Sequence, residues 1–373
     1  MAQDERPAGR RGAMTFLAAV ALLAAGCGQI PLAGTVDTRS TFRGHADVAA
    51  RVEAALTGPI EVTVPTVTDP GPVRVVPVRE GSTGARVAIV DVDGLLLNDR
   101  PSGPYSAGEN PVSGFRERLD AIGRDPTIRA VVLRINSPGG SVTACDVMAE
   151  DLRRFRERTG LPVVACLMDL GTSGAYYLAV GADHVLAHPT TVTGGIGALI
   201  NRYNLRDAMA QFNIVAEPIA SGPMVDMGSL AGPLSDEAER LLRDMADGFA
   251  ARFRGRVALR RPGVGDEDWE VLADGRVVAA SEAIDRQLID AIGYLDDAIA
   301  EAERRAGVAG GGAEVVLLKR RGDPARSIYA ETPNRPIQRE FFPISYPGLD
   351  RAKMPTFLYV WAPDPTLLTL GGS

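Results

Sequence analysis

The segment Pro162–Val180, with the sequence PVVACLMDLGTSGAYYLAV, joins an apolar run to a helix-like run through the turn TSG. The first run has the length of a buried strand, and AYYLAV resembles a packed helix. Ser173 stands at the junction and is followed by Gly174. We interpret the segment as a strand that turns sharply into a helix, a geometry that presents the serine hydroxyl.

Strand and helix patterns alternate on both sides of this junction. Apolar runs predict strands at RVAIVDVDGLLL, ending near Gly94, and at IRAVVLRIN and FNIVAEPI. Helical spacing of apolar residues predicts two helices before the junction, and Ser235 is the expected N-cap of a long one after it. The expected buried positions of the three helices are Phe115, Leu119 and Ile122; Met148, Leu152 and Phe155; and Leu242, Met245, Phe249 and Phe253. The alternation predicts the α/β class.

The chain of 373 residues is long enough for one large domain with tails or for two domains. We expect an export signal over 1–27, a Pro-, Thr- and Val-rich spacer or arm over 28–85, an α/β domain over 86–305, and a tail over 306–373. The run EVVLLKRRG in the tail has the pattern of one more strand. The remainder is interrupted by prolines, and such a tail usually wraps its own domain or a neighbouring subunit.

The N-terminal segment has the pattern of an export signal. Arg10 and Arg11 precede an apolar run from Met14 to Ala25, which small residues and Cys27 follow. The ending LLAAGC resembles a bacterial lipobox, which would make Cys27 a lipidated N-terminus and tether the chain to a membrane. The alternative is a soluble secreted protein with an incidental cysteine. We expect an exported protein, at the outer face of the cytoplasmic membrane or in the periplasm.

Composition excludes two classes of site. The formal net charge is −7, and no run rich in Lys and Arg occurs beyond the extreme N-terminus, which argues against nucleic-acid binding. Cys145 and Cys166 stand in apolar patterns without CxxC or His/Cys spacing, so they indicate small core residues rather than metal ligands. We expect neither a metal nor a cofactor.

Two glycine-rich turns follow predicted strands, SPGGS at Ser137–Ser141 and TSGA at Thr172–Ala175. Glycine allows the backbone to approach a ligand and to turn its N–H groups toward a developing oxyanion, as acyl transfer requires. Each turn alone is a weak signal, because glycine also forms ordinary tight turns. The pair makes Gly139, Gly140 and Gly174 candidate oxyanion donors.

Three stretches resemble the signal peptide peptidase A family in order and spacing. They are LRINSPGGSV, then PVVACLMDLGTSGAYYLAVGADHVLAHPTTVTGGIGAL, then VLADGRVVAASEAIDRQLIDAIGYLDDAI, within Val87–Ala300. The resemblance implies a Clp-protease/crotonase-like spiral of βαβ units, assembled into a homo-oligomeric ring near a membrane and cleaving peptides. It implies that Ser173 is the nucleophile and that Gly139 or Gly140, with Gly174, supplies oxyanion N–H groups.

The chain departs from the family at the general base. The family carries a lysine in an SG-x-x-K-D element, and the matching stretch SGPMVD has Val225 in that place. A serine that commonly orients this lysine is replaced by Gly195 in TGGIG. The only lysines are Lys319 and Lys353, both outside the resembling region. Arginine cannot replace the base because it stays protonated.

Other bases remain open. His184 and His188 follow Ser173 in DHVLAH, although His184 is expected to point away from the serine. Asp226 is kept from the family motif, but a carboxylate is a poor base for serine alone. Lys319 or Lys353 of a neighbouring subunit could enter the site in a ring.

Three functions fit these observations. The first is a membrane-tethered serine peptidase that uses Ser173 and an unidentified base. The second is a catalytically silent relative that binds peptides or acts as a scaffold. The third, a crotonase acting on acyl-CoA, conflicts with an export signal because CoA is cytoplasmic. We expect slow or absent hydrolysis, since an unactivated serine is a weak nucleophile.

Overall fold

The computed structural model describes residues 71–99, 109–321, 323, 325–330 and 357–360, all within the compact unit Val67–Ser373. Cys27 and Lys353 lie outside the described residues. Among the residues described, no helix is both long and apolar enough to cross a bilayer.

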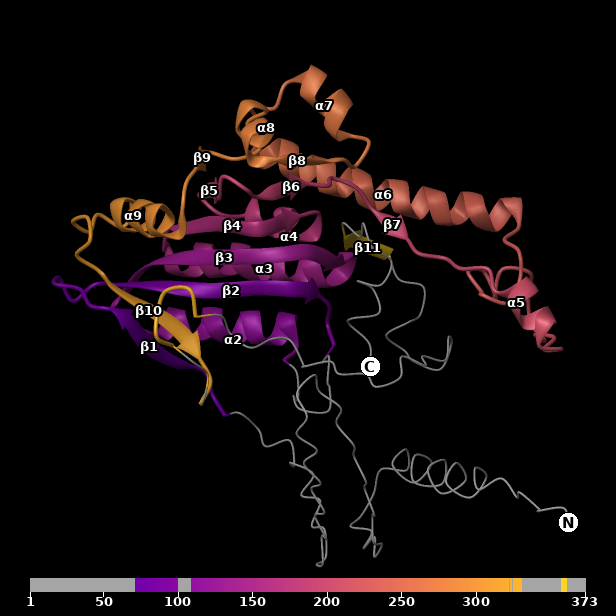
Figure 1. Cartoon of the computed structure of the whole chain (residues 1–373), viewed down its shortest axis with the longest axis horizontal. Coiled ribbons are helices and arrows are strands. Elements are labelled where there is room, and N and C mark those ends of the chain that lie inside the picture. Colours follow the sequence, from indigo (N-terminus) through magenta and orange to yellow (C-terminus); the bar gives the residue numbers. More distant parts are fainter. Residues whose placement is uncertain (1–70, 100–108, 322, 324, 331–356, 361–373) are drawn as a thin grey trace, which may run out of the picture. The chain divides into compact units, whose positions relative to one another are not determined.

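One twisted sheet carries the fold (Figure 1). Its main path runs β1-β10-β2-β3-β4-β5-β9, in which β2 to β5 are neighbours in chain order and all strands from β10 to β9 pair in parallel. β1 pairs antiparallel at one edge. The strands of this path are β1 Arg74–Arg79, β2 Arg86–Leu96, β3 Ile128–Ser141, β4 Val163–Thr172, β5 His184–Ala187, β9 Ala291–Ile292 and β10 Glu314–Lys319.

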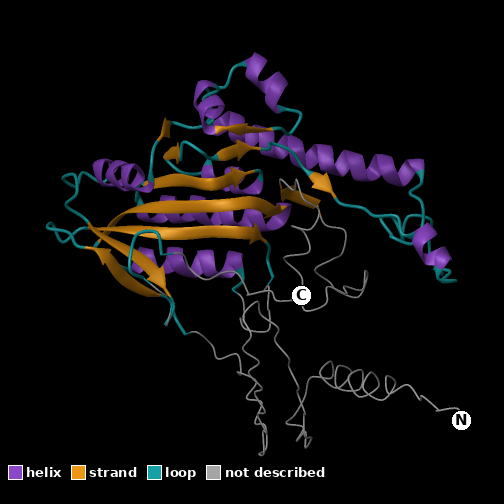
Figure 2. Ribbon diagram, in the orientation of Figure 1, coloured by secondary structure: helices purple, strands orange, loops and turns teal. Residues whose placement is uncertain are grey.

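Helices connect the parallel strands and cover the sheet (Figure 2). The helices are α2 Pro111–Arg124, α3 Val142–Thr159, α4 Gly174–Ala179, α5 Arg206–Gln211, α6 Asp236–Arg260, α7 Asp266–Leu272, α8 Ala280–Asp285 and α9 Leu295–Arg305. Side chains of α2, α3 and α4 share one buried cluster with one face of the central strands, and α9 packs against the other face. The α/β class predicted from the sequence is confirmed, and the parallel strands joined by helices are consistent with the Clp-protease/crotonase-like spiral of βαβ units that the resemblance implies.

Local sequence explains most element boundaries near the site. The predicted stripes of α2 and α3 are buried, with Phe115 and Met148 each 1% exposed. Ser141 caps α3 by accepting from the N–H of Ala144, and Ser235 caps α6 by accepting from that of Ala238. In α6 the predicted stripe is only partly correct, because Met245 is exposed.

Two predictions need correction. The stretch 212–219, FNIVAEPI, forms no strand, and its large apolar side chains are exposed because no neighbouring strand pairs with them. The predicted spacer and tail also contribute to the sheet: β1 comes from 28–85, and β10 from 306–373 pairs with both β1 and β2. The sequence pattern places these strands outside the domain because β1 and β10 lie far apart in the chain, and neither segment alone indicates its partner.

Three short strands and one tail strand complete the sheet around the end of β4. They are β6 Val192–Gly194, β7 Leu199–Ile200, β8 Val277–Ala279 and β11 Phe357–Val360. β6 pairs in parallel with β4, and β8 pairs antiparallel with β6. β11 lies antiparallel to both β3 and β7.

Candidate active site

Ser173 occupies the junction between β4 and α4, as the sequence predicts. Its backbone has φ 52° and ψ −119°, a conformation that residues other than glycine rarely adopt. The N–H of Ser173 donates to the carbonyl oxygen of Gly194 at 2.7 Å, and its own carbonyl accepts from Tyr177 at 2.8 Å. The strained turn is therefore held from β6 on one side and from the first turn of α4 on the other.

The Ser173 hydroxyl is nearly enclosed. The residue is 2% exposed, and its hydroxyl makes no hydrogen bond to any part of the chain that the structure describes. Thr172 beside it is fully buried, and its hydroxyl likewise has no partner within the described ranges. Two adjacent hydroxyls at the end of β4 are thus without a hydrogen-bond partner among the described residues.

The predicted turn Ser137–Ser141 is instead the end of strand β3, and it lies against the turn that carries Ser173 and Gly174. A Cβ on Gly139, which has φ 101°, would lie 2.7 Å from the backbone nitrogen of Gly174. The N–H of Gly139 already donates to Ser137 Oγ at 3.1 Å, and that hydroxyl donates to the carbonyl of Gly94 at 2.6 Å. Gly139 therefore shapes the site by letting the backbone approach Gly174, while its own N–H is engaged.

Gly140 is equally confined. A Cβ there would lie 1.9 Å from the carbonyl oxygen of Leu96, and one on Gly174 would lie 2.3 Å from Cys145 Sγ. No side chain fits at either position without moving backbone or core. The N–H of Gly174 lies at the N-terminus of α4 and stays the candidate oxyanion donor that the sequence predicts.

Gly195 lies beside the serine. A Cβ on Gly195 would lie 3.3 Å from the nitrogen and 3.5 Å from Cβ of Ser173. Because Gly195 has φ 69°, a side chain there would also strain the backbone. The position matched to the family's orienting serine is therefore next to Ser173.

Val225 does not complete this arrangement. It is 67% exposed in the turn Ser221–Gly228, so it is not packed against the buried Ser173. Asp226 is exposed in the same turn. In the described residues the structure does not bring the position of the family's lysine to the serine.

The alternative bases are engaged elsewhere. His184 pairs with Val164 near the start of β4, and Ser173 follows the end of that strand, about 25–30 Å along it. The Nδ1 atom of His184 lies 3.2 Å from Arg305 and 3.8 Å from Glu301. Burial lowers the pKa of His184. His188 contacts Thr190 and packs edge-on against Tyr294.

Lys319 is buried in its own domain. Its Nζ donates to the carbonyl of Ala330 at 2.7 Å and lies 3.7 Å from Asp91 Oδ2. Arg134 binds Asp91 and donates to the same carbonyl of Ala330 at 3.0 Å. Burial lowers the pKa of Lys319. Lys319 thus anchors the residues before 331 and is withdrawn from a neighbour's site.

Arginines fix the far end of α4, and with it the Ser173 turn. The carbonyls of Tyr177, Val180 and Gly181 accept from arginines of α6 and α3, which suits cations at a helix C-terminus. The donors are Arg256, Arg260 and Arg156. Asp183 pairs with Arg156 and accepts from the N–H of Val163, so it fixes the fold as expected.

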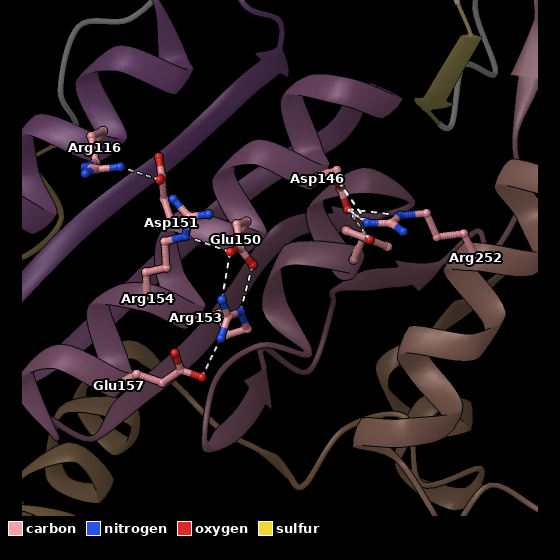
Figure 3. Close-up of polar contacts among 9 residues, drawn as sticks. Arg116, Asp146, Glu150, Asp151, Arg153, Arg154, Glu157 and Arg252 are labelled. Carbon is pink, nitrogen blue, oxygen red and sulfur yellow. Dashed lines mark hydrogen bonds and ion pairs between the residues drawn. The ribbon is translucent and has the colours of Figure 1, made fainter.

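A second polar contact joins α3 to α6 near the site. Arg252 of α6 binds both oxygens of Asp146 of α3, at 2.8 and 3.0 Å (Figure 3). Asp146 also accepts from the hydroxyl of Tyr177 at 2.6 Å. Other ion pairs in Figure 3, such as Arg153 with Glu150, follow the exposed face of α3. The link at Asp146 holds α6 over α4, whereas the exposed pairs contribute little.

Sequence reasoning missed one feature of the site, the tail strand β11. Tyr359 pairs with Gly140, and its carbonyl oxygen would lie 2.0 Å from a Cβ on Gly139. The prolines around this segment gave no strand pattern. Within the described residues no group of His, Cys, Asp and Glu is arranged to hold a metal ion.

Comparison with known proteins shows which proteins this chain is similar to. Residues 156–309 match the model of peptidase family S49. The putative signal peptide peptidase SppA of Enterococcus faecium is 26% identical over 221 residues, which cover 59% of this chain and 64% of that protein. The chloroplastic serine protease SPPA of Arabidopsis thaliana is 32% identical over 233 residues, covering 61% and 34%.

A solved structure of a mutant of the 1510-N membrane-bound stomatin-specific protease shares 12% identity, with a TM-score of 0.39, over 63% of this chain and 97% of that one. The chain thus spans about one third to two thirds of the length of the two curated relatives named above. Residues 156–309, which include β4, α4 and α9, are therefore similar to peptidase family S49, and the chain is similar to the two signal peptide peptidase relatives named above.

Proposed function

We propose that this chain is a membrane-associated, signal-peptide-peptidase-like protein whose groove binds extended peptides at Ser173 and whose peptide hydrolysis is slow or absent. The observation that supports it most is the junction itself: a strained Ser173 beside Gly174 and Gly139, with no base at its hydroxyl among the described residues. Such a site can accept a carbonyl but activates its serine poorly.

Peptide binding is supported by the strands around the junction. β3 and β7 both offer backbone groups to an extended segment, since each already pairs with β11. Strand addition of this kind supplies affinity through main-chain hydrogen bonds and specificity through side-chain pockets. The substrate or ligand class is therefore an extended peptide, such as a signal-peptide remnant.

The alternative, a fully active peptidase, needs a base that other copies of the chain supply. Val225 carries no basic group and Lys319 is buried in its own domain, so neither position supplies a base within one chain. Exposed apolar residues around Val225 support assembly into a homo-oligomer, the ring expected of the family. The proposed membrane association rests on lipidation of Cys27, which only the sequence pattern LLAAGC supports.

The decisive test is labelling with a serine-reactive fluorophosphonate, comparing the purified full chain with Ser173→Ala. We expect weak labelling that the substitution removes, together with peptide turnover near background. Rapid turnover that vanishes in Ser173→Ala would overturn the proposed silence. Labelling unchanged by Ser173→Ala in a folded sample would overturn the assignment of Ser173.

A restoration variant separates a missing base from a damaged groove. Val225→Lys combined with Gly195→Ser returns both family groups, and Gly195→Ser alone is the matched control. We expect hydrolysis in the assembled protein for the double variant only. No gain in the assembled double variant would mean that the groove has also changed.

A further inference from the structure

A cleft of about 570 Å³ opens at the edge of the sheet where β3 and β4 begin. The last turns of α2, α3 and α9 form its walls, and α9 marks this end of the sheet in Figure 1. Ser173 follows the opposite end of β4, which spans about 30 Å, so the cleft is separate from the candidate active site. A volume in this range is typical of sites that bind small molecules.

Three arginines from three different elements line this cleft. They are Arg129 of β3, Arg158 of α3 and Arg305 of α9, and together they define the arginine cleft. Asp125 is the only carboxylate in its described lining. The chain as a whole has a formal net charge of −7, so a positively charged cleft runs against the overall balance.

The carboxylate of Asp125 is already engaged by other groups. Its Oδ1 atom accepts from the N–H and the hydroxyl of Thr127, at 2.9 and 2.5 Å. Its Oδ2 atom lies 3.4 Å from Nη1 of Arg86, a further arginine outside the lining. Asp125 therefore does not compensate the charges of the three arginines.

The carboxylates outside the cleft compensate the arginines only in part. Arg158 lies 3.3 Å from Asp120, and a second arginine of α2 binds the same carboxylate. Arg305 shares Glu301 with Arg304, each at 2.6 Å. Because each carboxylate faces two guanidinium groups, net positive charge remains at the cleft.

Arg129 has no partner that explains its position. A helix C-terminus favours cations in its last turn, which accounts for Arg158 and Arg305 without a ligand. Arg129 instead belongs to β3, is exposed, and forms no ion pair or side-chain hydrogen bond within the described ranges. Since like charges repel, three guanidinium groups around one cleft favour a bound anion.

Two glycines keep the arginine cleft open. A Cβ on Gly123, in the last turn of α2, would lie 3.4 Å from Nη2 of Arg158. Gly160 ends α3 in the left-handed conformation, with φ 67°. Neither position carries a side chain that would cover Arg158, whose side chain is 51% exposed.

We propose that the arginine cleft binds a molecule that carries a phosphate group. A guanidinium forms two parallel hydrogen bonds to a phosphate, and a phosphate has more acceptor oxygens than a carboxylate, so several arginines can bind one phosphate. The phosphate belongs either to a soluble compound or to a lipid headgroup. The inference does not depend on the proposed peptide binding at Ser173.

The test measures binding of inorganic pyrophosphate to the purified full chain by isothermal titration calorimetry at low ionic strength, where salt screens the charges least. Arg129→Gln and Arg158→Gln each remove one guanidinium and keep a polar side chain. Arg154→Gln is the matched control. Arg154 lies one turn before Arg158 in α3, pairs with Glu150, and does not line the cleft (Figure 3).

We expect Arg129→Gln and Arg158→Gln each to weaken pyrophosphate binding about tenfold, because each loses hydrogen bonds to a charged group. Arg154→Gln and Ser173→Ala should bind as the wild type does. Arg129→Lys keeps the charge without the paired donors, so its affinity should lie between those of the wild type and Arg129→Gln. It also decides the question if a glutamine variant does not fold.

Vesicles of phosphatidylcholine with and without phosphatidic acid distinguish the two sources of phosphate. If pyrophosphate binds, cosedimentation with phosphatidic acid vesicles that falls in Arg129→Gln assigns a lipid headgroup, and cosedimentation that does not fall assigns a soluble compound. No binding of pyrophosphate to the wild type, or equal binding by all the arginine variants, would overturn the phosphate site. Fluorophosphonate labelling at Ser173 is unaffected by that result, so the two proposals fail separately.

Discussion

At the scale of single residues, Ser173 shows how this site stores strain. A positive φ is unfavourable for any residue with a Cβ, and the native turn imposes φ 52° on a serine. The hydrogen bond from its N–H to Gly194 and the packing of α4 hold the conformation. Such strain costs about 1–3 kcal/mol and persists only where surrounding structure enforces it.

Replacing this serine by glycine therefore has a predictable effect on stability. We expect Ser173→Gly to have a free energy of unfolding about 1 kcal/mol higher than Ser173→Ala, since glycine relieves the strain but loses more chain entropy. Ser173→Ala is the matched control because it removes the hydroxyl and keeps the strain. Urea denaturation measures the difference, and equal stability of the two variants would contradict a strained turn.

The site was predictable where its signal is local. Ser173 and Gly174 are adjacent in the sequence, and the change from a strand pattern to a helix pattern locates them. Gly139 was predictable as a site residue from the glycine pair in SPGGS, although this stretch ends strand β3 and forms no turn. Tyr359 was not, because it meets these glycines from the other end of the chain, and a four-residue strand among prolines has no periodicity.

His184 gives stability a dependence on pH. Burial lowers the pKa of folded His184, although Asp290 and Glu301 oppose the shift. The unfolded chain then binds a proton more readily, so the free energy of unfolding falls as pH drops through about 6.5, the ordinary pKa of histidine. We expect His184→Gln to reduce this fall between pH 7.5 and 5.5, measured by denaturation at each pH.

The variant His188→Gln is the control, because it removes a histidine that is not part of the contacts of His184 with Asp290 and Glu301. If the fall in stability were unchanged in His184→Gln and absent in His188→Gln, the pH dependence would belong to His188 and the assignment to His184 would be wrong.

At the scale of elements, regular periodicity predicted the helices and strands that bury one face within the domain. The stripe of α2 and the run of β3 needed no distant information, since their own spacing defines the buried positions. FNIVAEPI at 212–219 shows the limit: its apolar run has the pattern of a strand, but a strand also requires a partner, and the sequence does not supply one. The predicted end of the spacer at residue 85 has the opposite explanation. The segment of β1 has a weak strand pattern, but β10 supplies a partner for it.

The docking of β11 depends measurably on one hydroxyl. Tyr359→Phe keeps the ring and removes the hydrogen bond from the tyrosine hydroxyl to the carbonyl of Phe249. We expect the free energy of unfolding to fall by about 1–2 kcal/mol. Tyr329, which is 49% exposed, provides the control, and Tyr329→Phe is expected to change stability by less than about 0.5 kcal/mol. Equal effects of the two substitutions would mean that Tyr359 is not docked as described.

At the scale of the whole molecule, the surface of 201–234 differs from the rest of the described surface. Phe212, Val215 and Ile219 are exposed, at 77%, 76% and 104%, and Val225 follows them. Single exposed apolar residues are ordinary, but a run of large ones in one segment is typical of an interaction surface. The same segment carries SGPMVD, the stretch that the sequence analysis matches to the family's base motif.

We expect this segment to mediate association between copies of the chain, because a second copy would bury these side chains and supply the missing strand partner for FNIVAEPI. Val215→Asp with Ile219→Asp places two charges in the contact, and burying unpaired charges is costly. The mass measured by light scattering should fall to that of a monomer, about 39.4 kDa for the full chain, while Leu259→Asp, at an equally exposed apolar residue of α6, leaves it unchanged. Unchanged assembly in the double variant would place the interface elsewhere, and monomeric wild-type protein would show that these apolar residues serve another partner.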